Sequence, residues 1–136
     1  MVNHKLVLVF YYLNIGKTAA FSLNILSRID TTSATPQALV IAPARELARQ
    51  ILDNIREMGQ FTKVTVKLAV PGSIERNERI NTNVIVGTPG TVMDIIKKRQ
   101  LNVNGIKVFV LDEADSMLDQ QGLGDTSVRI KKYIII

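Results

Sequence analysis

The fold of this chain is decided by the stretch "IKVFVLDEAD", Ile106–Asp115. Its first part, Ile106–Asp112, predicts a β-strand with apolar side chains on both faces, which is typical of a central strand in a parallel sheet. The acidic residues Asp112 and Glu113 stand where this strand ends. The stretch therefore predicts a buried strand that delivers carboxylates to the carboxyl edge of a sheet.

The rest of the chain repeats the order of a strand followed by a helix. The predicted strands are Leu6–Tyr12, Ala38–Ala42, Val64–Val70, Val84–Val86 and Ile106–Asp112. The predicted helices are Lys17–Ile29, Arg45–Gln60, a short one capped by Ser73, and one that starts with Thr88 as its cap and Pro89 in its first turn. Such a succession predicts an α/β fold, with a parallel β-sheet flanked by helices on both faces. The segment "DTTSATPQ", Asp30–Gln37, predicts a flexible loop.

The composition is that of an ordinary folded domain. The 136 residues suffice for one domain with a real core, and 46% of them are hydrophobic against 21% charged. The 17 basic and 12 acidic side chains give a net charge of +5, which suits a polyanionic partner and serves solubility equally well. The absence of cysteine excludes a disulfide framework and a thiolate zinc site, and it fits a reducing compartment.

The apolar run "LVLVFYYL", Leu6–Leu13, has two interpretations. Its eight residues are too short to span a bilayer, so no membrane insertion is expected. A signal peptide is one alternative, because His4 and Lys5 precede the run, but Lys17 lies before the only small-residue cleavage candidate. A buried strand explains the run better.

Three loops of the predicted sheet lead into helices from the same edge. They follow Ala42, Val70 and Gly87. Exposed backbone N–H groups and the helix dipole make each helix start a candidate phosphate site, although any one of them alone is as well explained by a structural connection. Three such starts on one edge of a basic domain favour contact with a phosphate backbone.

The acidic pair at the end of the last strand has a chemical interpretation. A carboxylate such as Asp112 can hold Mg²⁺ through water, because magnesium uses few protein ligands and keeps several waters. The neighbouring Glu113 can orient or deprotonate an attacking water. An acidic first turn of a helix is the alternative, and the nucleotide interpretation gains its strength from Gly16-Lys17-Thr18, which is how a phosphate-binding loop ends.

Four motifs in order resemble one known family, the DEAD-box RNA helicases, in their first RecA-like lobe. They are "GKTAAF" (16–21, the end of motif I), "APARELARQ" (42–50, motif Ia), "VGTPGT" (86–91, motif Ib) and "VLDEAD" (110–115, motif II). The stretches "VPGSIERN" (70–77) and "SMLDQQGLGD" (116–125) are most similar to the mRNA-export branch that acts at the nuclear pore. The resemblance implies a RecA-like P-loop NTPase domain, a parallel sheet flanked by helices, over residues 16–132.

The resemblance also implies roles for the residues of a nucleotide site that uses ATP and Mg²⁺. Lys17 would neutralise the β- and γ-phosphates, Thr18 would ligate Mg²⁺, and Asp112 would hold that Mg²⁺ through water. Glu113 would position or activate the hydrolytic water, and Asp115 would link the nucleotide state to the second lobe. The implied nucleotide-binding residues are Asn14, Ile15, Gly16, Lys17, Thr18 and Ala19.

The same resemblance implies an RNA-binding set at the sheet edge. Its members are Pro43, Arg45, Gly72, Thr88, Pro89 and Gly90. For Arg45 a salt bridge on an exposed helix turn is the alternative. For Thr88, helix capping and phosphate contact are compatible.

The phosphate-binding loop departs from the family pattern, which reads Ala-x-x-Gly-x-Gly-Lys-Thr. Tyr11 stands at the small first position and Asn14 at the earlier glycine. Glycine permits dihedral angles that other side chains forbid, and Asn tolerates the left-handed region better than most residues. We therefore expect a weakened loop.

The departures continue at both ends of the chain. Residues 1–15 form an atypical segment with a predicted first strand and lack the family's glutamine motif, and residues 133–136, "YIII", stand where Ser-Ala-Thr is expected. These features predict a piece of a longer helicase, truncated at both ends, that is inactive by itself because the second lobe is missing.

Two functions from different classes follow from these observations. One is the ATP-binding lobe of an RNA helicase that unwinds RNA or remodels RNA–protein complexes, with RNA, a second RecA-like lobe, and nuclear-pore or export factors as partners. Its location would be cytoplasmic or nuclear, including the nuclear pore. The other is a catalytically silent remnant that binds RNA or protein. A different P-loop NTPase is disfavoured, because motifs Ia and Ib would then be coincidences.

Overall fold

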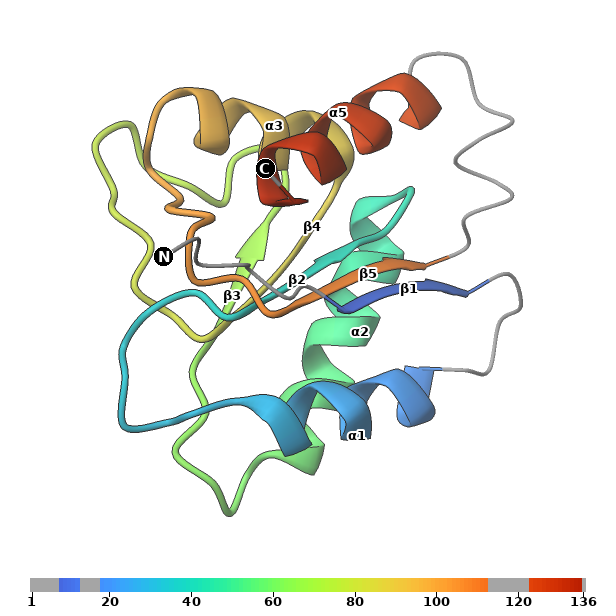
Figure 1. Ribbon diagram of the computed structural model, residues 1–136, viewed down its shortest axis with the longest axis vertical. Helices are drawn as coiled ribbons and strands as arrows, with labels where there is room; N and C mark the ends of the chain where they lie inside the picture. Colours follow the sequence, from blue (N-terminus) through green and yellow to red (C-terminus); the bar gives the residue numbers. More distant parts are fainter. Residues whose placement is uncertain (1–7, 13–17, 113–122, 136) are drawn as a thin grey trace, which may run out of the picture.

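The computed structural model describes residues 8–12, 18–112 and 123–135. At its centre lies a five-stranded sheet in the order β1-β5-β2-β4-β3, in which every neighbouring pair is parallel (Figure 1). The strands are β1 (Leu8–Tyr12), β2 (Ala38–Ile41), β3 (Val66–Ala69), β4 (Val84–Gly87) and β5 (Val108–Asp112). The predicted strands are confirmed to within a few residues at their ends, and β5 occupies an interior position between β1 and β2.

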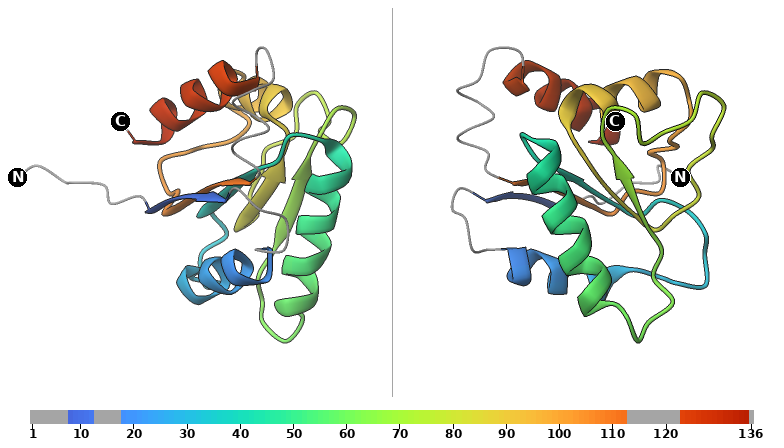
Figure 2. Two further views of the ribbon diagram at one scale, coloured as in Figure 1. Left: turned by 90° about the vertical axis from the view of Figure 1, so that its right-hand side faces the viewer. Right: turned by 180° about the vertical axis from the view of Figure 1, so that it is seen from behind.

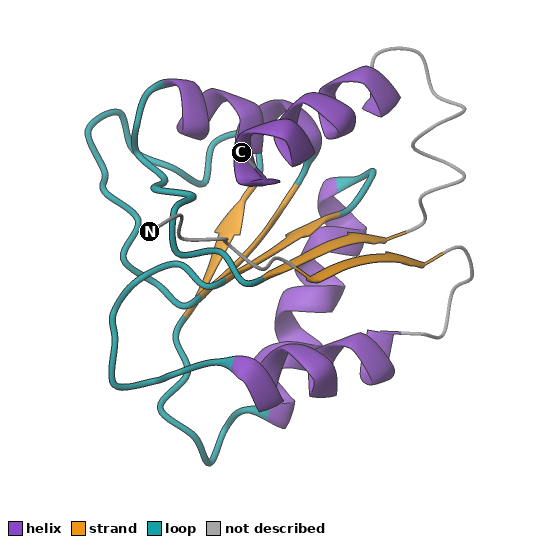
Figure 3. Cartoon of the chain, in the orientation of Figure 1, coloured by secondary structure: helices purple, strands orange, loops and turns teal. Residues whose placement is uncertain are grey.

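Helices cover both faces of the sheet, as the two turned views show (Figure 2). Helices α1 (Thr18–Arg28) and α2 (Arg45–Met58) pack together on one face, and α3 (Pro89–Lys97) and α5 (Leu123–Ile135) on the other (Figure 3). This arrangement confirms the predicted α/β fold. None of the described helices has the length and apolar character that crossing a membrane requires.

Each face of the sheet has its own hydrophobic core, because successive side chains of a strand point to opposite faces. In β5, Val108 and Val110 pack toward α1 and α2, whereas Phe109 and Leu111 pack toward α3 and α5. All four of these side chains are buried. Their burial explains why the stretch that opened the sequence analysis is apolar at both alternating sets of positions.

The expected short helix at Ser73 is wrong. The structure has neither helix nor strand between β3 and β4, so that residues 70–83, which we call the β3–β4 connection, run from one edge of the sheet back to the other. The Ser73 hydroxyl donates to carbonyl oxygens of Leu68 and Val70, at 2.9 and 2.8 Å, and accepts from the Val70 N–H at 2.8 Å. It closes a turn onto the end of β3, and no helix follows it before β4.

The loop predicted at residues 30–37 is held by side-chain hydrogen bonds. The Gln37 amide pairs with the backbone of Asp30, accepting from its N–H and donating to its C=O, both at 2.8 Å. Asn83 donates to the Ser33 carbonyl oxygen at 2.7 Å, and both Gln37 and Asn83 are buried. Hydrogen bonds from Thr32 hold the pKa of the Asp30 carboxyl below its usual value. The prediction of a flexible loop did not anticipate this fixed arrangement.

Candidate functional site

The strands that lead into the two halves of the predicted nucleotide site are neighbours and end at the same edge of the sheet. In the parallel pair β1–β5, Tyr12 lies opposite Asp112, and each is the last residue of its strand. The chain leaves β1 beside Asp112 and enters α1 at Thr18, so that residues 13–17 join these two points. A strand end, a buried carboxylate and a helix N-terminus thus belong to one corner of the sheet, an arrangement suited to a nucleotide phosphate.

Asp112 is the carboxylate that the structure places at this corner. Its side chain is 7% exposed at the end of β5. Among the described residues there is no cluster of three or more metal-ligating His, Cys, Asp or Glu side chains. A buried carboxylate at a strand end fits Mg²⁺ even without such a cluster, because magnesium is commonly bound by one or two carboxylates together with water and phosphate oxygens.

Part of the predicted nucleotide site lies outside the described residues. The residues concerned are Asn14, Ile15, Gly16, Lys17, Glu113 and Asp115. Thr18 and Ala19 begin α1, as the predicted helix requires. Tyr11, which stands at the small first position of the family's loop, belongs to β1 and lies opposite Leu111.

The predicted RNA-binding residues gather along the same carboxyl edge, at the ends of β2, β3 and β4. Pro43 lies between β2 and α2, and Arg45 is the first residue of α2. Thr88 follows β4, and Pro89 and Gly90 begin α3. The Ala42 N–H donates to the Gly87 carbonyl oxygen at 2.9 Å, and the Thr88 N–H donates to the Ala69 carbonyl oxygen at 3.1 Å. These two hydrogen bonds join the ends of all three strands.

Two of these residues had an alternative role that the structure tests. Arg45 is exposed and forms no ion pair with any other described residue, so the salt-bridge alternative fails within that part of the chain. Thr88 is the N-cap residue of α3, with extended backbone, but its side chain makes no capping hydrogen bond. Thr88 therefore occupies the predicted N-cap position, but its hydroxyl does not form the hydrogen bond that a capping side chain would make.

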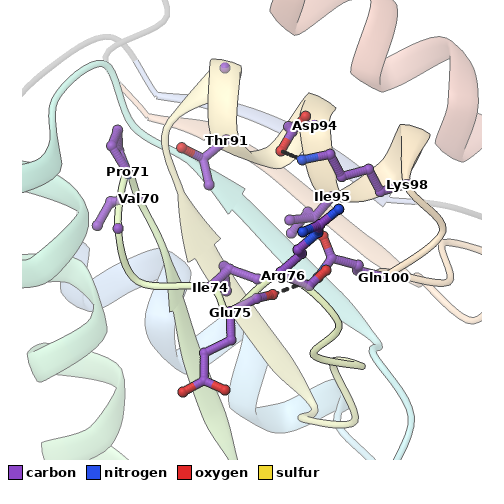
Figure 4. Close-up of a pocket in the computed structure, with 12 residues that line it drawn as sticks. Val70, Pro71, Ile74, Glu75, Arg76, Thr91, Asp94, Ile95, Lys98 and Gln100 are labelled. Atoms are coloured by element: carbon purple, nitrogen blue, oxygen red, sulfur yellow. Dashed lines mark hydrogen bonds and ion pairs between the residues drawn. The ribbon is translucent and has the colours of Figure 1, made fainter.

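The two candidate glycines line a shared hollow between the β3–β4 connection and α3 (Figure 4). Gly72 has φ +86°, a backbone conformation that favours glycine, and both Gly72 and Gly90 have open space where a Cβ would stand. The hollow has a volume of about 400 Å³. Its polar lining includes Arg76, Gln100 and the ion pair between Lys98 and Asp94, whose atoms lie 3.0 Å apart.

A second ion pair fixes the β3–β4 connection to its strand. The Lys67 Nζ of β3 lies 2.8 Å from the Glu78 Oε2, and both side chains are partly buried. The Glu75 N–H also donates to the Glu78 carboxylate, at 3.2 Å. Both hydrogen bonds lower the pKa of the Glu78 carboxyl below its usual value, and the bond from Lys67 has the larger effect. Glu78 is therefore charged at neutral pH and helps to hold the connection in place.

Motif-based reasoning missed the residues of this hollow that lie beyond the stretches resembling the family, namely Asp94, Ile95, Lys98 and Gln100. Gln100 follows α3 in a stretch that carries no family motif, and nothing in its neighbourhood in the sequence marks it. Its partners lie more than twenty residues away along the chain. Only the three-dimensional arrangement brings it to the edge.

Comparison with known proteins places this geometry among the helicases. The family model described as DEAD/DEAH box helicase matches residues 6–134. The chain is 58% identical over 119 residues to "ATP-dependent RNA helicase DBP5" of Candida glabrata, covering 88% of this chain and 24% of that protein. It is 57% identical over 119 residues to the protein of the same name from Saccharomyces cerevisiae, again covering 88% of this chain and 25% of that protein. The chain thus spans about a quarter of the length of these relatives.

Solved structures give the same result. S. cerevisiae Dbp5 bound to RNA and ADP BeF3 superimposes with a TM-score of 0.86 at 52% identity, covering 96% of this chain and 33% of that chain. A variant of S. cerevisiae Dbp5 bound to Nup159, a Gle1 variant, IP6 and ADP superimposes with a TM-score of 0.88 at 52% identity, covering 94% of this chain and 35% of that chain. The fold, the motifs and the comparisons agree.

Proposed function

The chain belongs to the DEAD/DEAH box helicase family, and we propose that it is the ATP-binding lobe of an RNA helicase that couples ATP hydrolysis to RNA unwinding or remodelling of RNA–protein complexes. The observation that carries the proposal is the register of β1 and β5. It sets Asp112 beside the end of β1, from which the chain continues through Lys17 to Thr18. This register supports the proposal, because the strand that leads into motif I ends beside Asp112 of motif II.

In this proposal the chain's own residues divide the work on the nucleotide. Lys17 binds the β- and γ-phosphates, and Thr18 and Asp112 hold the metal, Asp112 through water. Glu113 orients or deprotonates the attacking water, and Asp115 transmits the nucleotide state to a second lobe. When bound, Mg²⁺ neutralises charge that develops on the phosphate oxygens. Asn14, Ile15, Gly16 and Ala19 complete the loop and helix start around the phosphates.

RNA binds along the neighbouring part of the same edge. Pro43 and Arg45 after β2, and Thr88, Pro89 and Gly90 after β4, follow the RNA backbone, with Gly72 at the end of the row. Support comes from the hydrogen bonds that join the ends of β2, β4 and β3. The net charge of +5 suits a polyanionic ligand.

The partners proposed for this chain follow from its relatives. One solved structure of S. cerevisiae Dbp5 is bound to RNA, and another, of a variant, is bound to Nup159, a Gle1 variant and IP6. We propose that this lobe works with a second RecA-like lobe and with nuclear-pore or export factors of this kind. Its place of action would then be the cytoplasm, the nucleus or both, including the nuclear pore, in mRNA export.

The departures in the phosphate loop favour a second candidate, a catalytically silent module that binds RNA or protein. Tyr11 and Asn14 replace a small residue and a glycine of the family's pattern. Such a module keeps motifs Ia and Ib and loses the nucleotide. Titration with Mg-ATP distinguishes the two candidates, because only the first requires nucleotide binding.

The isolated 136-residue chain is expected to show negligible RNA-stimulated ATPase activity. The chain spans about a quarter of its relatives, and closure on ATP and RNA in this family requires a second lobe. A coupled-enzyme assay with and without single-stranded RNA measures this directly. Robust turnover by this chain alone would contradict the proposed dependence on a second lobe.

Replacement of Arg45 by alanine is expected to weaken RNA binding by about fivefold and to lower the slope of log K against log salt by about one, because one phosphate contact is lost. Fluorescence anisotropy of a labelled single-stranded RNA at several salt concentrations measures both quantities. Arg56→Ala is the matched control, since Arg56 is exposed in the last turn of the same helix, toward the opposite edge. Equal effects of the two substitutions would remove Arg45 from the RNA-binding set.

A further inference from the structure

The backbone of the β3–β4 connection needs hydrogen-bond partners that regular secondary structure does not supply. Residues 70–83 contain neither helix nor strand, so their backbone carbonyl oxygens need partners from elsewhere or from water. This segment carries Gly72 to the carboxyl edge and also supplies one wall of the hollow that Gly72 shares with Gly90. Whatever fixes the connection also fixes that wall.

One side chain from outside the connection bonds to three of its carbonyl oxygens. The Gln100 Nε2 lies 2.9 Å from the oxygen of Glu75, 2.9 Å from that of Glu78 and 3.3 Å from that of Arg76. An amide NH₂ has two hydrogens, so the two short contacts are the principal bonds and the third is shared. The Gln100 carbonyl oxygen in turn accepts from the Ile80 N–H at 3.0 Å. A single residue therefore bonds to the connection through both its side chain and its backbone.

The end of α3 holds Gln100 in the orientation that these bonds require. Arg99 takes φ +58°, and the N–H groups of Gln100 and Leu101 both donate to the Ile95 carbonyl oxygen, at 2.9 and 3.1 Å. This pattern ends the helix and reverses the chain direction. The buried side chains of Leu101 and Ile80 belong to the same hydrophobic core on either side of Gln100.

Gln100 also lines the hollow that the two predicted RNA-binding glycines share. Figure 4 shows Gln100 reaching from the end of α3 to Glu75, with Arg76 beside it. The ion pair of Glu78 with Lys67, 2.8 Å, fastens the same part of the connection to β3. The connection is thus held between β3 on one side and α3 on the other.

We propose that Gln100 is a positioning residue for RNA binding, which sets the β3–β4 connection, and with it Gly72, against Gly90 on the carboxyl edge. Gln100 acts through the carbonyl oxygens of Glu75 and Glu78 and not by touching the RNA. The inference rests on the proposed RNA-binding function of this edge. It adds a residue that none of the family motifs in this chain contains.

The test replaces Gln100 by leucine, which has a similar size and cannot donate a hydrogen bond. Gln60→Leu is the matched control, because Gln60 is exposed just beyond α2 and its side chain has no hydrogen bond to any described residue. Gln100→Lys restores a donor of sufficient length and serves as the rescue. The first measurement is hydrogen exchange of the free protein. Gln100→Leu is expected to speed exchange at the amides of Glu78 and Ile80, and Gln100→Lys to return most of the protection.

The second measurement is binding of a fluorescein-labelled single-stranded oligouridine by anisotropy. Gln100→Leu is expected to weaken binding roughly five- to tenfold, because a preorganised wall is lost. The slope against salt should stay unchanged, because no phosphate contact is removed. A general loss of fold would instead appear in circular dichroism and at amides throughout the sheet, and in that case Glu78→Gln, which breaks only the ion pair with Lys67, takes over as the test variant.

The outcomes separate this inference from the proposed function. If the unmodified chain binds the RNA and Gln100→Leu binds equally well, despite faster exchange at Ile80, the positioning role is wrong and the proposed function stands. If the unmodified chain binds no RNA at all, the RNA-binding function fails and the inference falls with it. Weaker RNA binding by Gln100→Leu with unchanged hydrogen exchange at Glu78 and Ile80 would show that Gln100 acts on the RNA directly, and it would overturn the inference as stated.

Discussion

Replacement of Lys17 by alanine is expected to reduce the affinity for Mg-ATP by about a hundredfold or more, which corresponds to about 3 kcal/mol. The lysine amine is the positive charge that motif I supplies to the β- and γ-phosphates, and the neighbouring backbone N–H groups of the loop and of α1 do not replace a full charge. Isothermal titration calorimetry with Mg-ATP measures the change.

The matched control for this experiment is Lys63→Ala. Lys63 is exposed between α2 and β3, at the amino edge of the sheet, and its removal changes the net charge by the same amount. Binding that is lost with Lys17 and kept with Lys63 supports the nucleotide site. Absence of Mg-ATP binding in the unmodified chain would favour the catalytically silent candidate, and equal affinity of the unmodified chain and the Lys17 variant would remove Lys17 from the site.

Replacement of Gly87 by alanine is expected to destabilise the fold by about 3 kcal/mol, because it overpacks a closed site between two strands. A Cβ at Gly87 would meet the carbonyl oxygen and the Cβ of Ala69, as well as the Cγ2 of Val92 at 2.7 Å. Ala69 lies opposite Gly87 in the β3–β4 pair, so backbone must move to admit the methyl group. Urea unfolding followed by circular dichroism measures the loss as a lower midpoint.

Gly90→Ala is the control for the Gly87 experiment. Gly90 lies only three residues further along the chain, in the first turn of α3, and has open space where a Cβ would stand. Alanine favours a helix over glycine by up to about 1 kcal/mol, so this variant should be as stable as the unmodified chain or slightly more stable. A Gly87 variant that unfolds at the same urea concentration as the Gly90 variant would contradict the tight packing at the end of β4.

The sequence predicted the sheet well because its strands are marked by local apolar runs. Residues 106–112 are the clearest example, since a strand buried on both faces needs apolar side chains at both alternating sets of positions. The predicted family is confirmed by the match of residues 6–134. By contrast, the register that sets Tyr12 opposite Asp112 joins strands a hundred residues apart, and no local pattern specifies it.

The errors arose where side chains bond to distant or unexpected backbone groups. Ser73 has the local signature of a helix cap, but its hydroxyl bonds back to Leu68 and Val70. Residues 30–37 have the composition of a flexible loop, but the side chains of Gln37 and Asn83 donate hydrogen bonds to the loop's backbone carbonyl oxygens and hold it in place. Gln100 carries no local signal at all. The bonds of Asn83 and Gln100 join residues far apart in the chain, whereas Ser73 bonds to the end of the strand just before it.

The central claim is that the loop after β1 and Asp112 share one metal-bound nucleotide. Backbone amide signals recorded by NMR with Mn²⁺-ATP in place of Mg²⁺-ATP test it, because paramagnetic Mn²⁺ broadens the signals of nearby nuclei. The account predicts that the signals of Thr18 and Asp112 are lost together, while those of Asn83 and Gly105, which lie at the amino edge, persist. Loss at only one of Thr18 and Asp112, or at neither of them with nucleotide bound, would contradict it.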